Sequence, residues 1–219
     1  IGIIANRSIT SFVSIIASLA AGIPYVPIHY KYPLKRQISI LERAECSVLV
    51  LDETNASVME KLLPKITKSV FILWIGSENI DKNFKIPHWH RLVSVNATAG
   101  REPETSDSRA ACLLFTSGST GEPKGIRIKH SNIISYVNSI QKIYKPNETD
   151  RFSQIFDQTF DLSLHDMFVA WSTGASLFCI PDNERHAPGR FIKKHSLTFW
   201  FSTPSTIALM QSAKLLKAN

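Results

Sequence analysis

Short apolar runs alternate with helix-length segments along most of this 219-residue chain. Strand character is found at residues 2–5, 25–28, 48–51 and 70–75, and helical periodicity at residues 9–20, 34–44 and 56–63. Strands separated by helices pair in parallel, and their helices cover the faces of the sheet. The sequence therefore predicts an α/β fold of layered parallel β-sheets with helices on both faces, arranged as two βαβ lobes.

A polar stretch interrupts this alternation. Residues 76–109 carry Gly76, Pro87, Gly100 and Pro103 and predict an excursion over the surface. Strands are then expected at residues 111–115, 126–129, 152–156, 175–180 and 198–202, and helices at 131–143, 163–172, 188–195 and 204–216. We expect the break near residue 105 to divide a first lobe, residues 1–105, from a second lobe, residues 106–219.

Composition excludes several classes of protein. The hydrophobic fraction of 44% and the charged fraction of 20% are those of a globular domain. The apolar stretch at residues 12–28 is broken by serine, glycine and proline and is too short to predict membrane insertion. The net charge of +7 is spread along the chain and forms no basic stripe, which argues against nucleic acid as a partner.

The three cysteines and the first residue indicate the setting of the chain. Cys46, Cys112 and Cys179 lie far apart, each within an apolar run. This pattern is typical of buried reduced thiols in a cytoplasmic protein and suggests neither a metal site nor disulfides. Because the chain opens at Ile1 in a strand-like run, we interpret it as an excerpt from a longer polypeptide.

Residues 115–125 combine glycines, hydroxyls and one lysine between two apolar runs, the pattern of a backbone that wraps phosphates. The glycines permit positive φ and remove Cβ atoms that would hold the main chain away from an anion. The hydroxyl residues add donors, and the lysine adds a positive charge. These residues are Gly118, Gly121 and Gly125; Thr116, Ser117, Ser119 and Thr120; and Lys124.

Two other interpretations of this loop fit the residues less well. A flexible Ser/Gly connector does not require Pro123 and Lys124 directly before the alternating strand at residues 126–129. A P-loop places glycine immediately before its lysine and serine or threonine after it. Here Pro123, which lacks the backbone N–H, precedes Lys124, and Gly125 follows it.

The order of residues 116–125 resembles the phosphate loop of the adenylate-forming ligases, the superfamily of acyl-CoA synthetases, luciferases and the adenylation domains of nonribosomal peptide synthetases. The resemblance extends over nearly the whole chain. It implies that Thr116, Ser117, Gly118, Ser119, Thr120, Gly121 and Lys124 bind the β- and γ-phosphates of ATP. A substrate carboxylate would attack the α-phosphorus, giving an acyl adenylate and pyrophosphate.

A second segment, residues 160–163, resembles the Phe-Asp-x-Ser motif of the amino-acid-activating members. By this resemblance Asp161 receives the substrate α-ammonium, and Leu162 and His165 line the same pocket. A desolvated ammonium needs an opposite charge, which fatty and aryl acids do not. The residues alone leave another interpretation open, in which Asp161 or Ser163 caps a helix and His165 is structural.

The resemblance implies ATP-dependent activation of an amino acid as aminoacyl-AMP, followed by transfer to the phosphopantetheine thiol of a carrier protein. ATP and Mg²⁺ are the expected cofactors. The family's catalytic lysine and its magnesium and ribose ligands are expected outside this chain. Free-standing ligases such as those for D-alanine or proline and modules of larger synthetases fit equally. A catalytically silent nucleotide-binding domain and an acyl- or aryl-CoA ligase are the alternatives, and the amino acid is not specified.

Overall fold

The computed structural model describes residues 1–66, 68–75, 89–91, 108–117, 122–185 and 187–212. It divides by contacts into two compact units, Ile1–Ser131 and Asn132–Asn219, and each is described by itself. This division falls later in the chain than the lobe boundary expected near residue 105. That boundary stays a prediction about the domains of the whole protein.

A five-stranded parallel sheet forms the centre of the first unit. Its strand order is β2-β1-β3-β4-β5, and every neighbouring pair is parallel. The strands are β1 (Gly2–Ala5), β2 (Val26–His29), β3 (Val48–Asp52), β4 (Phe71–Ile75) and β5 (Trp89–Arg91). The first four lie within a residue or two of the positions predicted from the sequence, and β5 falls inside the stretch that was expected to be a surface excursion.

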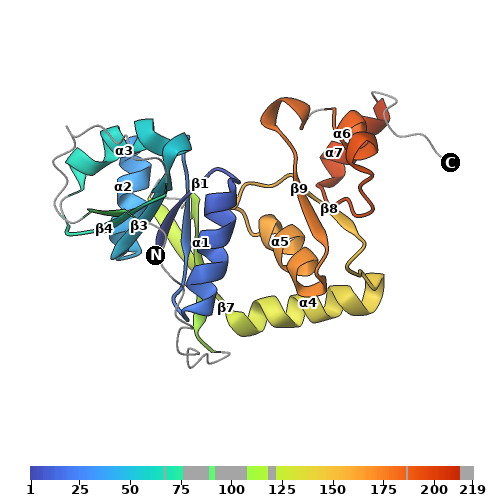
Figure 1. Cartoon of the computed structure of the whole chain (residues 1–219), viewed down its shortest axis with the longest axis horizontal. Coiled ribbons are helices and arrows are strands. Elements are labelled where there is room, and N and C mark those ends of the chain that lie inside the picture. The colour runs from blue at the N-terminus through green and yellow to red at the C-terminus, as the bar shows by residue number, and fades with distance from the viewer. Residues whose placement is uncertain (67, 76–88, 92–107, 118–121, 186, 213–219) are drawn as a thin grey trace. The chain divides into compact units, whose positions relative to one another are not determined.

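Three α-helices connect these strands, namely α1 (Ile9–Ala20), α2 (Leu34–Arg43) and α3 (Ala56–Leu62). Since β2 lies on one side of β1 and β3 on the other, right-handed crossovers put α1 on one face and α2 and α3 on the opposite face, as Figure 1 shows. Side chains of α2 and α3, including Ile40 and Leu62, pack with Ile28 and Leu49 of the sheet into one buried core. The predicted arrangement of a parallel sheet with helices on both faces is confirmed.

Helix α1 buries hydroxyl groups as well as an apolar residue. Ser11, Ser14 and Ser18 are buried with Ile15. The Oγ of Ser18 donates to the carbonyl of Ile23 at 2.7 Å, so burial leaves its hydroxyl satisfied. The opposite stripe of α1, with Ile9, Val13 and Ile16, is exposed.

The ends of β1 and β3 are joined by a network around Asp52, which is 6% exposed. Its carboxylate accepts from the hydroxyl of Ser8 at 2.8 Å, the backbone N–H of Thr54 at 3.1 Å and the amide of Asn55 at 2.8 Å. The hydroxyl of Thr54 donates to the same carboxylate. Because Ser8 is also the N-cap of α1, the network fixes the start of that helix to the end of β3.

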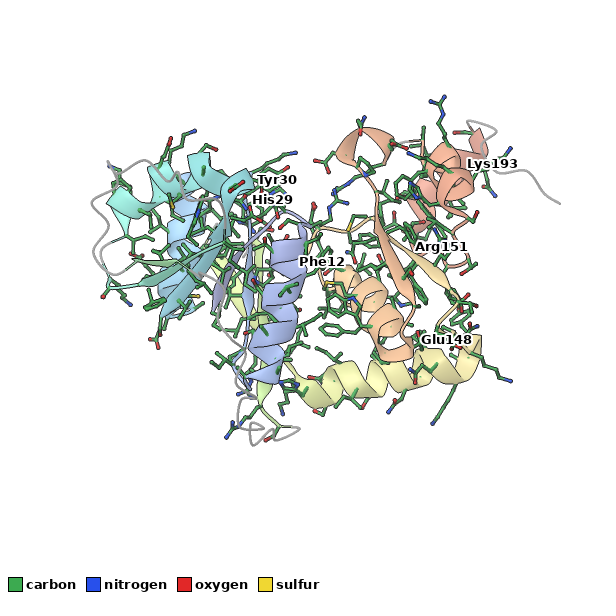
Figure 2. The ribbon with its side chains drawn as sticks, viewed as in Figure 1. Phe12, His29, Tyr30, Glu148, Arg151 and Lys193 are labelled. Carbon is green, nitrogen blue, oxygen red and sulfur yellow. The ribbon has the colours of Figure 1, made fainter. Side chains whose placement is uncertain are left out.

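The end of β2 is fixed by a glutamine. The side-chain amide of the buried Gln37 donates to the carbonyls of His29 and Tyr30 at 3.2 and 3.1 Å. The rings of His29 and Tyr30, labelled in Figure 2, stack with centroids 4.9 Å apart. These contacts connect β2 with α2.

An antiparallel hairpin of β6 (Ala110–Ser117) and β7 (Pro123–Lys129) also belongs to the first unit. It joins the unit through Tyr25, whose N–H donates to the Ala111 carbonyl at 3.1 Å and whose carbonyl accepts from the Leu113 N–H at 3.0 Å. Burial raises the pKa of the Cys112 thiol to about 12 and also raises that of Cys46. Both cysteines are buried and free as expected, whereas Cys179 is only half-buried, contrary to expectation.

The second unit contains a two-stranded parallel sheet of β8 (Arg151–Gln154) and β9 (Ser176–Cys179). Its helices are α4 (His130–Tyr144), which begins at the boundary, α5 (Leu162–Thr173), α6 (Gly189–His195) and α7 (Pro204–Ser212). Arg151, labelled in Figure 2, lies with its guanidinium 4.2 Å from the ring centroid of Phe178 and donates to the His195 carbonyl at 2.6 Å. Helix α5 ends at Gly174, whose φ of 72° is left-handed.

The strand predicted at residues 198–202 is wrong. Only Phe199 forms an isolated bridge, to Phe152, where the N–H of Ser153 donates to the Phe199 carbonyl at 3.1 Å. The following residues form no backbone ladder with β8, and the Phe201 N–H donates to the Ser153 hydroxyl at 3.4 Å. The indole of Trp200 donates to Ser202 at 2.9 Å, and the Thr203 carbonyl accepts the Thr206 N–H in the first turn of α7. Within the described part of the chain, no helix is long and apolar enough to cross a membrane.

Candidate functional site

Three of the predicted phosphate-binding residues lie at the turn end of the β6–β7 hairpin. Thr116 and Ser117 end β6, and Lys124 lies in β7 directly opposite Thr116. Paired residues of an antiparallel ladder point to the same face, so the hydroxyl and the ammonium are neighbours. All three side chains are exposed. The remaining predicted members, Gly118, Ser119, Thr120 and Gly121, lie outside the described residues.

Two expectations about this segment need correction. Strand β7 begins at Pro123, three residues earlier than predicted, so Lys124 and Gly125 are in a strand rather than a loop. Gly125 is not among the described glycines with positive φ. It lies opposite Phe115, and a Cβ at this position would approach the Phe115 Cζ to 3.0 Å. Glycine is therefore favoured by the close approach of an aromatic ring rather than by its backbone angle.

An ion pair joins the residue before β7 to α2. Glu122, which precedes β7, forms an ion pair with Arg43 at 3.3 Å. Both side chains are about half exposed, so the pair adds little stability in water. The pair connects α2 with the residue that precedes β7, two positions before Lys124.

The predicted substrate residues lie at the start of α5, in the second unit. Asp161 is the N-cap and accepts a hydrogen bond from the N–H of Leu162 at 2.9 Å. The capping role that the sequence left open is thus present, and the carboxylate is also exposed. His165 lies four residues after Asp161, on the same side of the helix. Binding of a substrate ammonium by Asp161 stays a prediction.

His165 is buried, with 8% of its surface exposed, and is held by two aromatic residues. The hydroxyl of Tyr136, from α4, lies 2.9 Å from its Nδ1. The ring of Phe201 packs against it with centroids 4.0 Å apart. Burial lowers the pKa of His165 to about 4, so the imidazole is neutral at neutral pH.

Asp166, the next residue of α5, is 0% exposed, and neither of its carboxylate oxygens makes a hydrogen bond of normal geometry. Burial raises its pKa well above the ordinary value, opposed in part by the nearby backbone N–H of Ile155. The pKa of Tyr136 is raised first by its own burial and then by the nearby charge of Asp166. Tyr136, His165 and Asp166 therefore form one cluster of titratable groups between α4 and α5.

The sequence did not single out Tyr136 or Asp166 as site residues. The sequence did contain a signal for Asp166, which is an acid next to a histidine in an otherwise apolar helix. Such an acid is a candidate site residue, because charged residues are rarely buried without a partner. No sequence signal connects Tyr136 with His165, since their contact depends on how α4 and α5 pack. Among the residues that the structure describes, no group of three or more histidine, cysteine or acidic side chains could hold a metal ion.

The sequence and the fold place this chain in a known class. The family model described as "AMP-binding enzyme" matches residues 1–219. The chain belongs to the AMP-binding enzyme family and is an adenylate-forming type of α/β domain. A solved adenylation domain of this class shares the fold of the chain at a TM-score of 0.86.

Three relatives illustrate the similarity. The L-proline--[L-prolyl-carrier protein] ligase of Streptomyces coelicolor is 31% identical over 93% of this chain and 39% of its own length. The solved structure with the TM-score of 0.86 is the Vibrio cholerae adenylation domain AlmE in complex with glycyl-adenosine-5'-phosphate. It is 26% identical and covers 97% of this chain and 42% of its own chain. Bacitracin synthase 1 of Bacillus licheniformis is 29% identical over 95% of this chain and 3% of its own length. The chain thus spans less than half of each of these proteins.

Proposed function

We propose that the protein containing this chain activates an amino acid with ATP, forming aminoacyl-AMP and pyrophosphate, and transfers the aminoacyl group to the phosphopantetheine thiol of a carrier protein. Membership of the AMP-binding family supports the adenylation step. The observation that carries the amino-acid assignment is the exposed carboxylate of Asp161 at the start of α5. Among the described residues it makes no ion pair, so its charge is available for an α-ammonium.

The hairpin residues have the chemistry for the phosphates of ATP. Lys124 supplies a positive charge, and Thr116 and Ser117 supply hydroxyl donors on the same exposed end of the hairpin. Adenylation is a substitution at phosphorus, in which positioning and neutralisation of charge contribute most of the catalysis. We assign Lys124, Thr116, Ser117 and the glycine-rich residues 118–121 to the β- and γ-phosphates.

The acceptor and the metal are proposed from the family and its relatives rather than from residues of this chain. Relatives named as carrier-protein ligases and peptide synthases support a carrier protein as the partner. Mg²⁺ would neutralise charge on the phosphates, with ligands expected beyond this chain, as is the catalytic lysine. The described residues alone do not complete a reaction site. The proposal applies to a free-standing ligase and to a module of a larger synthetase alike.

Exchange of labelled pyrophosphate into ATP, measured on the full-length protein with a panel of carboxylic acids, tests the proposal. We expect exchange that depends on one or a few amino acids. Exchange with fatty or aryl acids alone would contradict the amino-acid assignment and favour an acyl- or aryl-CoA type of ligase. No exchange with any acid, together with retained ATP binding, would indicate a catalytically silent nucleotide-binding domain.

Substitution of the hairpin lysine tests the phosphate assignment. Lys124→Ala should lower kcat/KM for ATP by roughly tenfold to a hundredfold, because a charge-assisted contact to phosphate is lost. Lys142→Ala, which removes an exposed lysine from α4, is the matched control and should leave ATP kinetics unchanged. Equal ATP kinetics in Lys124→Ala and wild type would exclude this role for the hairpin.

A further inference from the structure

A cavity of about 610 Å³ lies beside α2 and is lined by residues that have no part in the proposed function. Its walls come from α2, from the 3₁₀ turn η2 (Leu63–Lys65) that follows α3, and from Glu122 and Pro123 at the start of β7. All of these residues belong to the first unit. A cavity of this volume is large enough to hold a small organic ligand.

Part of the lining is apolar. Leu34 and Ile38, one turn apart on α2, are half-buried and pack against the buried core of the sheet. Pro123, which is buried, lines the cavity from the hairpin. These side chains offer no hydrogen bonds, so the part of a ligand that covers them must itself be apolar to gain from burial.

Three cations line the same cavity. Lys35 and Arg36 lie in the first turn of α2, and Lys65 ends η2. No described residue forms an ion pair with any of the three. The guanidinium of Arg36 is held 4.4 Å from the ring centroid of Tyr32, and its Nε makes no hydrogen bond. The charge of these side chains is therefore available to a ligand.

The stability of α2 does not explain the two cations at its start. The dipole of a helix favours acidic side chains in the first turn, and α2 has none there. The two acids of the lining do not neutralise Lys35 and Arg36. Glu42 lies two turns further along α2 than Lys35, and Glu122 pairs with Arg43. The start of α2 thus keeps a positive charge beside an apolar surface.

We propose that this cavity binds a small organic anion, whose carboxylate or phosphate group contacts Lys35 and Arg36 and whose apolar body covers Ile38 and Pro123. Exposed lysines alone are usually solvated, but a solvated patch needs no cavity and no apolar surface beside it. The site is separate from the one proposed for the phosphates of ATP. Successive residues of a strand point to opposite faces, so Lys124 points away from the face on which Pro123 lines the cavity.

Occupation of the cavity weakens the binding of ATP. Pro123 pairs with Ser117 across the hairpin and directly precedes Lys124, and Ser117 and Lys124 are both assigned to the phosphates of ATP. A second anion beside these residues repels the phosphates, because like charges repel. By linkage, ATP weakens the binding of the anion by the same factor. This consequence rests on the proposed function, whereas the binding site does not.

Two fluorescent dyes test the site in the full-length protein without any activity. Anilinonaphthalene sulfonate is an apolar anion, and phenylnaphthylamine has the same rings without the sulfonate. We expect saturable binding of the sulfonate. In Lys35→Gln it should be weakened by about threefold to tenfold, because a charged contact is lost, with little change for phenylnaphthylamine. Lys61→Gln, which removes an exposed lysine of α3 outside the cavity, is the matched control and should change neither. Equal binding of the sulfonate to Lys35→Gln and wild type would overturn the anion site.

Ser39→Phe tests whether the dyes occupy this cavity. Ser39 is a half-buried residue of the lining, so a larger side chain there should fill the cavity and abolish binding of both dyes. Unchanged binding in a folded Ser39→Phe would overturn the cavity as the site. Lys35→Gln combined with Lys65→Gln keeps the shape of the cavity and should weaken the sulfonate more than Lys35→Gln alone, which decides the question should Ser39→Phe not fold.

Displacement of the sulfonate identifies the class of ligand. Octanoate and octyl phosphate should displace it at lower concentrations than octanol does, and the stronger of the two identifies the head group as a carboxylate or a phosphate. Equal displacement by octanol would overturn the role of the charge. Displacement by an acidic carrier protein but by neither small anion would show a protein-docking surface and contradict the proposal of a small ligand.

Calorimetric titration with ATP, in the presence and absence of saturating anilinonaphthalene sulfonate, tests the coupling. We expect the Kd for ATP to rise by about threefold or more in wild type and to stay unchanged in Ser39→Phe, at the low end of typical coupling between sites. The same Kd in wild type with and without the sulfonate would contradict the coupling. Failure of ATP to bind at all would contradict the proposed function, whereas the dye titrations would still decide the anion site.

Discussion

Two buried aspartates, one in each unit, differ in whether their carboxylates accept hydrogen bonds. Asp52, at the carboxyl end of β3, accepts from Ser8, Thr54 and Asn55 and joins two strands to a helix. Asp166, in the middle of α5, is more deeply buried and accepts no hydrogen bond of normal geometry. The first carboxylate stabilises the fold, whereas the second is an unfavourable group that the fold tolerates.

The position of the unsatisfied acid explains the contrast. Asp166 lies directly after His165, on the helix that begins with the proposed ammonium-binding residue, and its charge acts on Tyr136. Strained or unsatisfied groups that persist in a fold concentrate at binding sites. Helix α5 thus keeps an unsatisfied carboxylate where the substrate pocket is proposed, whereas both oxygens of the carboxylate at the end of β3 accept hydrogen bonds.

Asp52→Ala should cost more stability than any single change in α5. It removes the acceptor for several donors at the junction of β1, β3 and α1, and we expect a loss of about 2–4 kcal/mol of unfolding free energy. Urea denaturation of the variant measures it. Glu60→Ala, at an exposed acid of α3, is the control and should change stability by less than about 0.5 kcal/mol. A similarly small loss in Asp52→Ala would remove the contrast.

Asp166→Asn should act in the opposite direction. The pKa of Asp166 is raised on folding, so above pH 3.8 the folded state holds a proton that the unfolded state releases. Stability then falls as pH rises through the window from 3.8 to the raised pKa. The variant, which cannot ionise, should be more stable than wild type at neutral pH by about 1–2 kcal/mol.

The gain from Asp166→Asn should vanish below pH 3.8, where the wild-type carboxyl is protonated in both states. Thermal or urea unfolding at a series of pH values measures this difference. Glu148→Gln, at an exposed acid of the same unit that is labelled in Figure 2, is the matched control and should show no such gain. A variant less stable than wild type across the whole range would show that Asp166 is a satisfied structural acid like Asp52.

Gly174→Ala tests whether the rest of α5 is ordinary scaffold, and its expected effect is the smallest. The nearest atom to an added Cβ is the Glu148 Cβ at 3.7 Å, so there is room for it. The left-handed φ of 72° alone should cost about 1 kcal/mol. Unfolding free energy measures it, and amino-acid selectivity should not change. Altered selectivity would mean that the pocket depends on the end of the helix as well as its start.

Much of the fold could be predicted because the apolar periodicity is local. The first four strands and α1, α2 and α3 were placed within a residue or two, since each pattern coincides with one buried face. The antiparallel hairpin was missed, although only residues 118–122 connect its strands, too few for a parallel crossover. Residues 198–202 looked like a strand by composition, but only Phe199 pairs.

The site was predictable only where the role of a residue depends on its sequence neighbours. Asp161 could be placed at a helix start because an N-cap is a local feature. The reason for Gly125 could not be found, since it depends on the ring of Phe115 across the hairpin. The contact between Tyr136 and His165 likewise joins two helices and leaves no pattern in either.

The central claim, that Asp161 selects amino acids by their ammonium, is tested most directly by Asp161→Asn in the full-length protein. Pyrophosphate exchange should be measured with the preferred amino acid and with its des-amino analogue. Asparagine keeps the size of the side chain and an oxygen for the cap while removing the charge. We predict that kcat/KM for the amino acid falls by roughly tenfold to a hundredfold, with much less change for the analogue and for ATP. Equal loss with both substrates would contradict the claim and leave Asp161 as a helix cap.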